Sequence, residues 1–401
     1  MNSADNKFTL SERVDSLIIF RNLLSDKTVS LLCRLDAVNQ SGSSRAELIS
    51  AYCDFIRSLF CNHHSLGAHV LGFILEDENI YTEYKLTGKG DGDVLESLLC
   101  RELEILSDIA RLDGSVYRDA IGDDSLPLWG NSPVDIFKNY REHIKHIRSR
   151  GTGVFAKYHM FILNGEGKLT PIANPDGQVL SDLVGYERER ERVILNTEAF
   201  LNGMPANNVL LYGDAGTGKS STVKAIANAY ADRGLRLVEL KKNQLPFIQP
   251  LMDTLADNPL KFILFIDDLT FSSGDADFCA LKATLEGGVA GRGSNILIYA
   301  TSNHRHMIKE LASDRVGDEI SVSDKLQEIV SLSARFGLTV TYSRADKALY
   351  SDIVIHLARR RGIEMDEQQL ISKAEAFALR GGGRNPRSAV QFIDMISAGI
   401  Y

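Results

Sequence analysis

The stretch NVLLYGDAGTGKSSTVKAIANAYA, residues 208–231, decides the fold of the second half of this chain. It starts as an apolar run of strand length, passes through a turn with three glycines and ends with helical spacing. Its middle, GDAGTGKS, fits the pattern GxxxxGK[ST], in which backbone N–H groups and the start of the following helix bind phosphates. We therefore predict a nucleotide-binding loop, which consists of Gly213, Asp214, Ala215, Gly216, Thr217, Gly218, Lys219, Ser220 and Ser221.

Two side chains of this loop have specific expected roles. Lys219 is expected to reach the outer phosphates of a nucleoside triphosphate, and Ser220 to offer its hydroxyl to Mg²⁺. A glycine turn that matches the pattern by chance is the alternative. The strand before the loop and the helix after it favour the phosphate-binding interpretation.

A second apolar run, FILFIDDLTF at residues 262–271, leads into two adjacent aspartates. The carboxyl ends of parallel strands meet at one edge of a sheet, so acidic residues ending one strand can lie beside a phosphate loop that follows another. We expect Asp267 to hold the Mg²⁺ and Asp268 to face the attacking water. Asp268 could instead cap the helix that follows, because aspartate is a good N-cap.

Short apolar runs alternate with helical segments in the second half of the chain, which indicates a parallel sheet with helices on both faces. We predict an α/β domain with five parallel strands at residues 181–343 and an all-helical lid at 344–401. A mainly helical domain is predicted at 1–130, with a helix and a hairpin in a connector at 131–180. Within the first domain, residues 68–75 are a candidate strand.

Composition narrows the class of protein. The chain has 401 residues, of which 44% are hydrophobic and 24% charged, as in ordinary globular proteins. Its apolar runs fall far short of the roughly 20 residues that a membrane helix needs, and its first residues do not resemble a signal peptide. Five scattered cysteines without a CxxC pair fit a reducing compartment. We therefore expect a cytoplasmic protein without a membrane partner, and the net charge of −8 argues against a large nucleic-acid surface.

The phosphate loop and the acidic strand together resemble those of the AAA+ ATPases, and the resemblance covers residues 181–401. The stretch ILIYATSN resembles the sensor-1 strand, which implies that Asn303 helps to position the hydrolytic water. SLSARFGL resembles a segment with an arginine finger, which implies that Arg335 acts on the nucleotide of a neighbouring subunit. GGGRNPRSAVQF resembles the sensor-2 helix, with Arg387 as the arginine that contacts the nucleotide and Arg384 as the alternative.

The same resemblance extends to the start of the α/β domain and to the chain as a whole. DLVGYERE resembles the segment that packs on the adenine, here through Val184 and Tyr186. The whole chain resembles a bacterial AAA+ group catalogued as a domain of unknown function. The resemblance implies ATP and Mg²⁺ as cofactors, a homo-oligomer in a ring or open ring formed through Arg335, and an unidentified macromolecular partner, either protein or DNA.

One departure from the AAA+ pattern bears on the rate of hydrolysis. Most AAA+ motors end the acidic strand in Asp-Glu, whereas Asp268 is one methylene shorter, which draws the carboxylate back by about 1.5 Å. Replication initiators and some helicase loaders of the superfamily also carry Asp-Asp and use ATP as a switch. We therefore expect slow hydrolysis that rises on assembly.

Three functions stay open at this point. The first is an ATPase whose nucleotide state controls oligomerisation and the binding of a macromolecular partner. The second is a nucleotide-gated, DNA-associated factor similar to an initiator or a helicase loader. The third, a protein-remodelling motor, ranks below the others because such a motor is expected to have an aromatic residue followed by glycine after the second strand, and KNQLPFIQP offers Phe247 and Ile248 without the glycine.

Overall fold

The chain forms two compact units, residues 1–157 and 158–401. The structure is a computed structural model that describes residues 8–62, 64–130, 133–270, 281–282, 284–285, 294–303 and 334–401. The division between the units falls inside the segment predicted as a connector. No helix among these described residues is long and apolar enough to cross a membrane.

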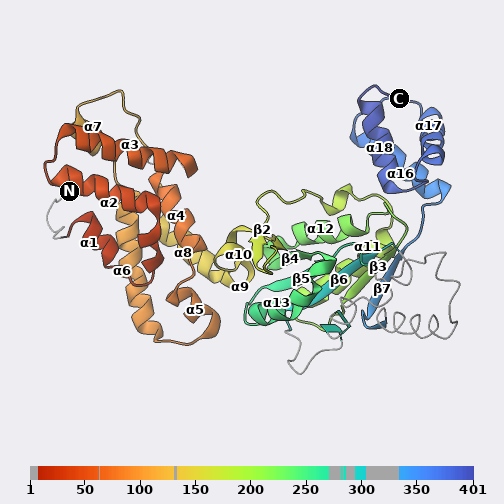
Figure 1. The fold of residues 1–401 in the computed structure, drawn as a ribbon, viewed down its shortest axis with the longest axis horizontal. Coiled ribbons are helices and arrows are strands. Elements are labelled where there is room, and N and C mark those ends of the chain that lie inside the picture. Colours follow the sequence, from red (N-terminus) through yellow and green to blue (C-terminus); the bar gives the residue numbers. More distant parts are fainter. Residues whose placement is uncertain are drawn as a thin grey trace. The chain divides into compact units, whose positions relative to one another are not determined.

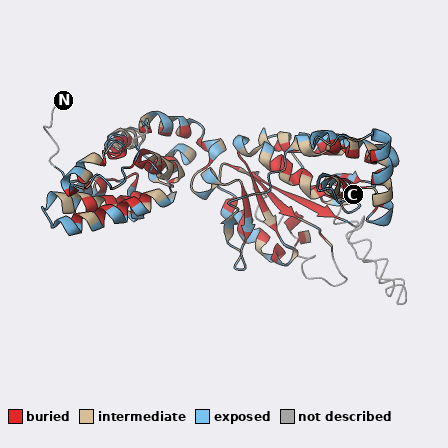
Figure 2. Ribbon diagram, turned by 90° about the horizontal axis from the view of Figure 1, so that it is seen from above, coloured by how far each residue is buried: buried red, intermediate tan, exposed pale blue. Residues whose placement is uncertain are grey.

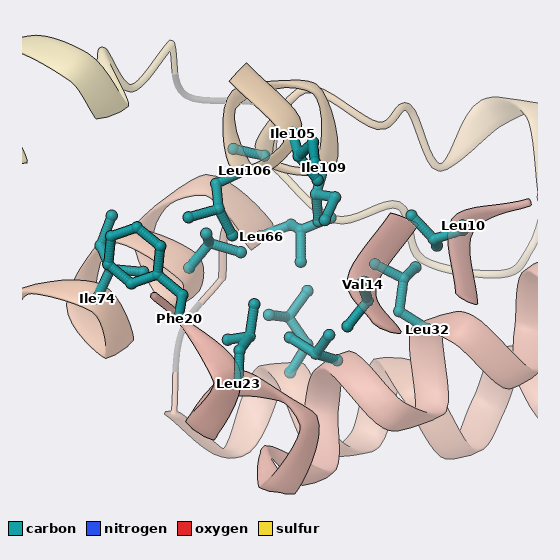
Figure 3. Close-up of a cluster of buried hydrophobic side chains, with 14 of the residues drawn as sticks. Leu10, Val14, Phe20, Leu23, Leu32, Leu66, Ile74, Ile105, Leu106 and Ile109 are labelled. Atoms are coloured by element: carbon teal, nitrogen blue, oxygen red, sulfur yellow. The ribbon is translucent and has the colours of Figure 1, made fainter. Parts of the chain in front are cut away.

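The first unit is helical, as predicted (Figure 1). Its elements are α1 (Leu10–Asp15), η1 (Arg21–Ser25), α2 (Lys27–Gln40), α3 (Arg45–Asn62), α4 (Leu66–Glu76), α5 (Ile80–Thr87), α6 (Gly92–Ala110), α7 (Ser115–Ile121), α8 (Ile136–Lys145), α9 (Ile147–Arg150) and α10 (Val154–Lys157). Side chains from α1, α2, α4 and α6 meet in one apolar core, part of which Figure 3 shows. Burial of this apolar surface is the main driving force for folding of the unit.

The prediction of a strand at residues 68–75 was wrong, because these residues belong to α4. Ser65 caps the helix by accepting a hydrogen bond from the backbone N–H of Ala68. Leu66, Val70 and Ile74 recur at four-residue intervals and are almost fully buried. A short apolar run in a helical core looks the same in a sequence as a buried strand, and only the packing partners distinguish them.

The second unit is built on one sheet with the strand order β2-β1-β4-β5-β6-β3-β7. Its strands are β1 (Met160–Leu163), β2 (Leu169–Pro171), β3 (Val209–Gly213), β4 (Leu235–Leu240), β5 (Lys261–Ile266), β6 (Ile296–Ser302) and β7 (Leu338–Tyr342). The five expected strands are present and all pair in parallel. Among the described residues the sheet nevertheless has seven strands rather than five, because β1 pairs in parallel with β4 and β2 adds an antiparallel edge.

Helices cover both faces of this sheet (Figure 1). The other elements of the unit are η2 (Leu180–Asp182), α11 (Glu187–Leu201), α12 (Lys219–Ala229), η3 (Ala231–Arg233), η4 (Lys242–Phe247) and α13 (Ile248–Leu255). Alternate strand residues form one apolar core with α11 and α12, including Leu235 and Leu237 of β4 and Ile263 and Phe265 of β5. The alternation follows from the two-residue period of a strand. Figure 2 shows that the central strands are buried while the outer surfaces of the helices are exposed.

The hairpin formed by β1 and β2 packs against the segment that follows β4. The side chain of Gln244 in η4 donates a hydrogen bond to the backbone oxygen of Leu163 at the end of β1 (3.0 Å). At the hairpin turn, a Cβ on Gly167 would lie 2.6 Å from the ring of Phe247. The chain at Gly167 therefore packs directly against that ring.

The carboxyl-terminal residues form the predicted helical lid, which consists of α16 (Lys347–Arg360), α17 (Glu367–Arg380) and α18 (Pro386–Ser397). The three helices share an apolar core of their own, in which Tyr350 and Phe392 are fully buried. Asn385 caps α18 by accepting a hydrogen bond from the backbone N–H of Ser388, and Pro386 follows at the first helical position. This cap fixes where α18 begins.

Candidate functional site

The predicted phosphate loop lies between the carboxyl end of β3 and the start of α12. Its glycines Gly213, Gly216 and Gly218 all have positive φ angles, of 139°, 79° and 91°. A Cβ at Gly213 would overlap the backbone of Tyr342 on the neighbouring strand β7. A Cβ at Gly216 would lie 2.7 Å from the side-chain oxygen of Asn385. The loop therefore requires glycine both for its backbone angles and for close approach to its neighbours.

Lys219, the first residue of α12, is buried at the base of this loop with 6% of its surface exposed. Its ammonium donates hydrogen bonds to the backbone oxygens of Gly213 (2.8 Å) and Asp214 (2.8 Å) and to the side-chain oxygen of Asn303 (2.9 Å). Burial lowers the pKa of Lys219, and the nearby aspartates Asp214, Asp267 and Asp268 oppose this effect. The structure thus connects the loop to the end of β6 through one cation.

Asp267 follows β5 and lies beside the loop, as the sequence predicted. One oxygen of its carboxylate, Oδ1, accepts hydrogen bonds from the hydroxyls of Ser220 (2.6 Å) and Thr301 (2.5 Å). Carboxylate and hydroxyl oxygens are hard donors of the kind that Mg²⁺ prefers. The residues present therefore fit a Mg²⁺ ion, which Ser220 and Asp267 would hold.

Thr301 was missed in the sequence analysis. It lies on β6, one position beyond the pair formed by Ile266 of β5 and Ala300 of β6. The signal that identifies it is this register, because a threonine near the end of β6 lies next to the first aspartate after the adjacent strand β5. The sequence contains the threonine, but it does not reveal which strands are neighbours.

Asp268 faces the same region from the next position of the chain. Its Oδ1 accepts a hydrogen bond from the side-chain amide of Asn303 (2.7 Å), whose oxygen in turn accepts from Lys219. The alternative, that Asp268 caps a following helix, is not supported at the two described residues after it, because Leu269 and Thr270 are not helical; residues 271–280 lie outside the described part of the chain. Hydrogen bonds therefore run without a break from Lys219 through Asn303, Asp268, Thr301 and Asp267 to Ser220.

These side chains open onto a cavity of about 550 Å³, which is within the usual range for small-ligand sites. The predicted residues that line it are Ala215, Gly216, Thr217, Gly218, Lys219, Ser220, Ser221, Asp267, Asp268, Asn303, Val184 and Arg387. Four predicted residues do not line it, namely Gly213, Asp214, Tyr186 and Arg335. Gln178, Asp182 and Arg190 line the cavity and were not singled out from the sequence.

Tyr186 does not line the cavity and instead contacts residues at and after the end of β7. Its hydroxyl donates a hydrogen bond to the backbone oxygen of Ser343 (2.7 Å), and its ring lies 5.3 Å from that of Tyr342. Burial is the main reason that the pKa of Tyr186 rises to about 12. The neighbouring Val184 lines the cavity and also packs against the core of the lid.

The two arginines considered at the start of α18 have different surroundings. Arg387 lines the cavity, and its backbone N–H donates a hydrogen bond to the backbone oxygen of Gly216 in the loop (3.2 Å). Arg384 instead forms an ion pair with Glu375 of α17 (2.8 Å). Of the two, Arg387 is therefore the one placed to meet a ligand of the loop.

Comparisons with known proteins give the following similarities. A family model described as "Protein of unknown function (DUF815)" matches residues 156–400. The replication factor C large subunit of Staphylothermus marinus is 33% identical over 114 residues, 26% of each protein. That of Methanococcus maripaludis is 29% identical over 102 residues, which are 24% of this chain and 21% of the relative. The chain thus spans about a quarter of the length of these curated relatives.

Two solved structures are similar to part of the chain. One is the RuvB Holliday junction branch migration motor of Thermotoga maritima, with 15% identity over 55% of this chain and 64% of that one and a TM-score of 0.38. The other is AMPPCP-bound DnaA of Aquifex aeolicus, with 17% identity over 56% and 66% of the two chains and a TM-score of 0.40.

Proposed function

We propose that this chain, which belongs to the family described as "Protein of unknown function (DUF815)", binds and slowly hydrolyses Mg·ATP on a second unit of AAA+ type. In this proposal the nucleotide state controls oligomerisation and the binding of a macromolecular partner. The observation that carries it is the continuous set of hydrogen bonds from Lys219 to Ser220 through both aspartates. A phosphate loop and an acidic strand end that share hydrogen bonds can act on one ligand.

Each residue then has a distinct role. Lys219 binds the outer phosphates, and Asp267 and Ser220 hold the Mg²⁺, which neutralises phosphate charge when bound. The oxygen of a water held by Asp268 and Asn303 bonds to the γ-phosphorus while the bond from that phosphorus to the β–γ bridging oxygen breaks. ADP and inorganic phosphate leave, and Asp268 accepts the proton of the water.

A switch is a better proposal than a threading motor. The segment after β4, where a motor is expected to carry a mobile aromatic loop, forms η4 and packs on the hairpin turn at Gly167. Gln244 adds a hydrogen bond from the same segment to β1. Because Phe247 is held by these contacts, it is more suited to packing than to gripping a substrate.

Calorimetric titration of Mg·ATP into the purified protein tests the proposal. We expect heat of binding for the native protein and an affinity about 10- to 100-fold lower for Lys219→Ala, the loss expected when a hydrogen bond to a charged group is removed. Lys224→Ala is the matched control, since it removes another lysine of the same helix, which pairs with Glu239 of β4 and does not line the cavity. Absence of heat with the native protein, or equal affinities for the two variants, would contradict the proposal.

A second test concerns the contact between the lid and the rest of the unit. Arg359, Arg360 and Arg361 each pair with a different carboxylate, and Arg360 pairs with the cavity residue Asp182 (2.5 Å). The other two arginines pair with residues of the lid itself. Arg360→Ala removes this pair. Because the pair is half-exposed, the variant should release a fluorescent ADP analogue only about two- to fivefold faster than the native protein.

Stopped-flow dissociation of that analogue measures the effect. Arg359→Ala, which removes a pair inside the lid, should leave the release rate unchanged. The double variant Asp182→Arg with Arg360→Asp exchanges the two charges and should restore the native release rate. Equal rates for the Arg359 and Arg360 variants would show that the pair does not couple the lid to the cavity.

A further inference from the structure

The backbone at Asp268 has an uncommon conformation. Its φ is 51°, and among the described residues only Tyr186 shares a positive φ without being glycine. This left-handed region is unfavourable for most side chains, and aspartate and asparagine tolerate it best. Strained backbone of this kind persists only when its surroundings hold it in place.

Thr301 supplies the contacts that hold it. Its hydroxyl donates to Asp267 Oδ1 (2.5 Å) and accepts from the backbone N–H of Asp268 (2.9 Å). Its backbone oxygen accepts from the N–H of Leu269 (2.7 Å). Leu269 is fully buried and Thr301 is 2% exposed, so three successive residues are fixed from one rigid position on β6.

We propose that Thr301 is a positioning residue that holds Asp268 in the left-handed conformation, and that this conformation requires the shorter acid in place of glutamate. The inference rests on the proposed function and deepens it. In this position the aspartate carboxylate already reaches the Asn303 amide (2.7 Å). The turn of the backbone, rather than an extra methylene, sets the reach of the carboxylate.

Glutamate is therefore expected to perform worse than aspartate at this position. Its longer side chain is poorly tolerated at positive φ, and its carboxylate would have to fold back to keep the contact with Asn303. If the shorter acid were only a defect, Asp268→Glu would raise the hydrolysis rate. The proposal expects the rate to fall by about tenfold or more, the effect of losing one hydrogen bond to a charged group.

Thermal unfolding tests the backbone part of the inference without any nucleotide. The test compares two pairs of proteins that differ by one methylene at this position. The first pair is native Asp268 and Asp268→Glu, and the second is Asp268→Asn and Asp268→Gln. In each pair the longer residue should lower Tm by about 2–4 °C, a shift of the size expected for one destabilising substitution in a domain of this length. Because charge is constant within a pair, repulsion from Asp267 does not contribute to the difference. Equal Tm values within both pairs would overturn the backbone argument.

Thr301→Val and Thr301→Ser test the positioning role. Valine keeps the shape of the side chain but removes the hydroxyl, whereas serine keeps the hydroxyl. Thr301→Val should reduce kcat by about tenfold or more and raise the Mg²⁺ concentration needed for tight binding of a fluorescent ATP analogue, whereas its affinity in EDTA stays unchanged. Thr301→Ser should restore kcat and the Mg²⁺ dependence to within about twofold of native, because its hydroxyl makes the same hydrogen bonds.

The outcomes separate this inference from the proposed function. If the native protein binds no Mg·ATP, the proposed function fails, and the Tm pairs still decide the backbone argument. If it binds and hydrolyses Mg·ATP but Asp268→Glu is faster than native, or Thr301→Val matches Thr301→Ser, the positioning role of Thr301 is wrong.

Discussion

Arg335→Ala should reduce the ATPase rate of the assembled protein by about 10³-fold, since an arginine finger supplied by a neighbour contributes rate enhancements of this order. The affinity of each subunit for Mg·ATP should stay unchanged. The rate per subunit, measured over a range of protein concentration alongside sedimentation velocity, tests this expectation. In the native protein the rate should rise as oligomers form, and in the variant it should stay at the monomer level.

The position of Arg335 in the fold is the reason for expecting an effect in trans. Arg335 precedes β7, whereas the phosphate loop follows the carboxyl end of the adjacent parallel strand β3. Leu338 pairs with Val209 at the start of β3, and Tyr342 pairs with Gly213 at its end. The two ends of β3, Val209 and Gly213, are four residues apart along the strand, which is roughly 13 Å. Arg335 does not line the cavity of its own subunit.

Arg359→Ala is the control for Arg335→Ala, because it removes an exposed arginine whose partner, Glu367, belongs to the lid. It should keep the concentration dependence of the native rate. Equal loss of activity in Arg335→Ala at concentrations where the native protein is monomeric would mean that the arginine acts within one subunit or only stabilises it.

Glu102→Ala should destabilise the first unit by about 3–5 kcal/mol, the cost of leaving several buried backbone donors unsatisfied, and this would remove much of the stability of a typical domain. Glu102 is fully buried in α6, and its carboxylate accepts hydrogen bonds from the backbone N–H groups of Ile18, Ile19 and Phe20. This connection between α1 and η1 has no helix or strand to satisfy its N–H groups. The alanine variant leaves three backbone donors without that acceptor.

The single tryptophan of the chain makes this measurement specific. Trp129 lies in the first unit, is 3% exposed and packs against Tyr52 and Phe55. Urea unfolding followed by tryptophan fluorescence therefore reports on the first unit. Glu104→Ala is the control, because Glu104 is exposed on the same helix and its loss should change stability by less than about 0.5 kcal/mol. A similar small change for Glu102→Ala would show that the connection finds other acceptors.

Much of the second unit was predictable because its signals are local. The glycine spacing of the phosphate loop dictates backbone angles within a few residues, and the apolar runs of the five strands report their own burial. The hairpin was also predicted, but its place in the sheet was not. Whether β1 pairs with β4 depends on hydrogen bonds between segments far apart in the chain, which no local pattern encodes.

Local patterns were sufficient to predict the phosphate loop with Lys219, the acidic end of β5 and the helical lid, since each depends on residues that are close together in the chain. They did not reveal that Thr301 contacts both aspartates, that Arg360 pairs with Asp182 or that Asp268 adopts a left-handed backbone. The physical reason is that these features arise where separate strands and helices meet. Strand order, register and helix packing, rather than residue type alone, set which side chains come within hydrogen-bonding distance.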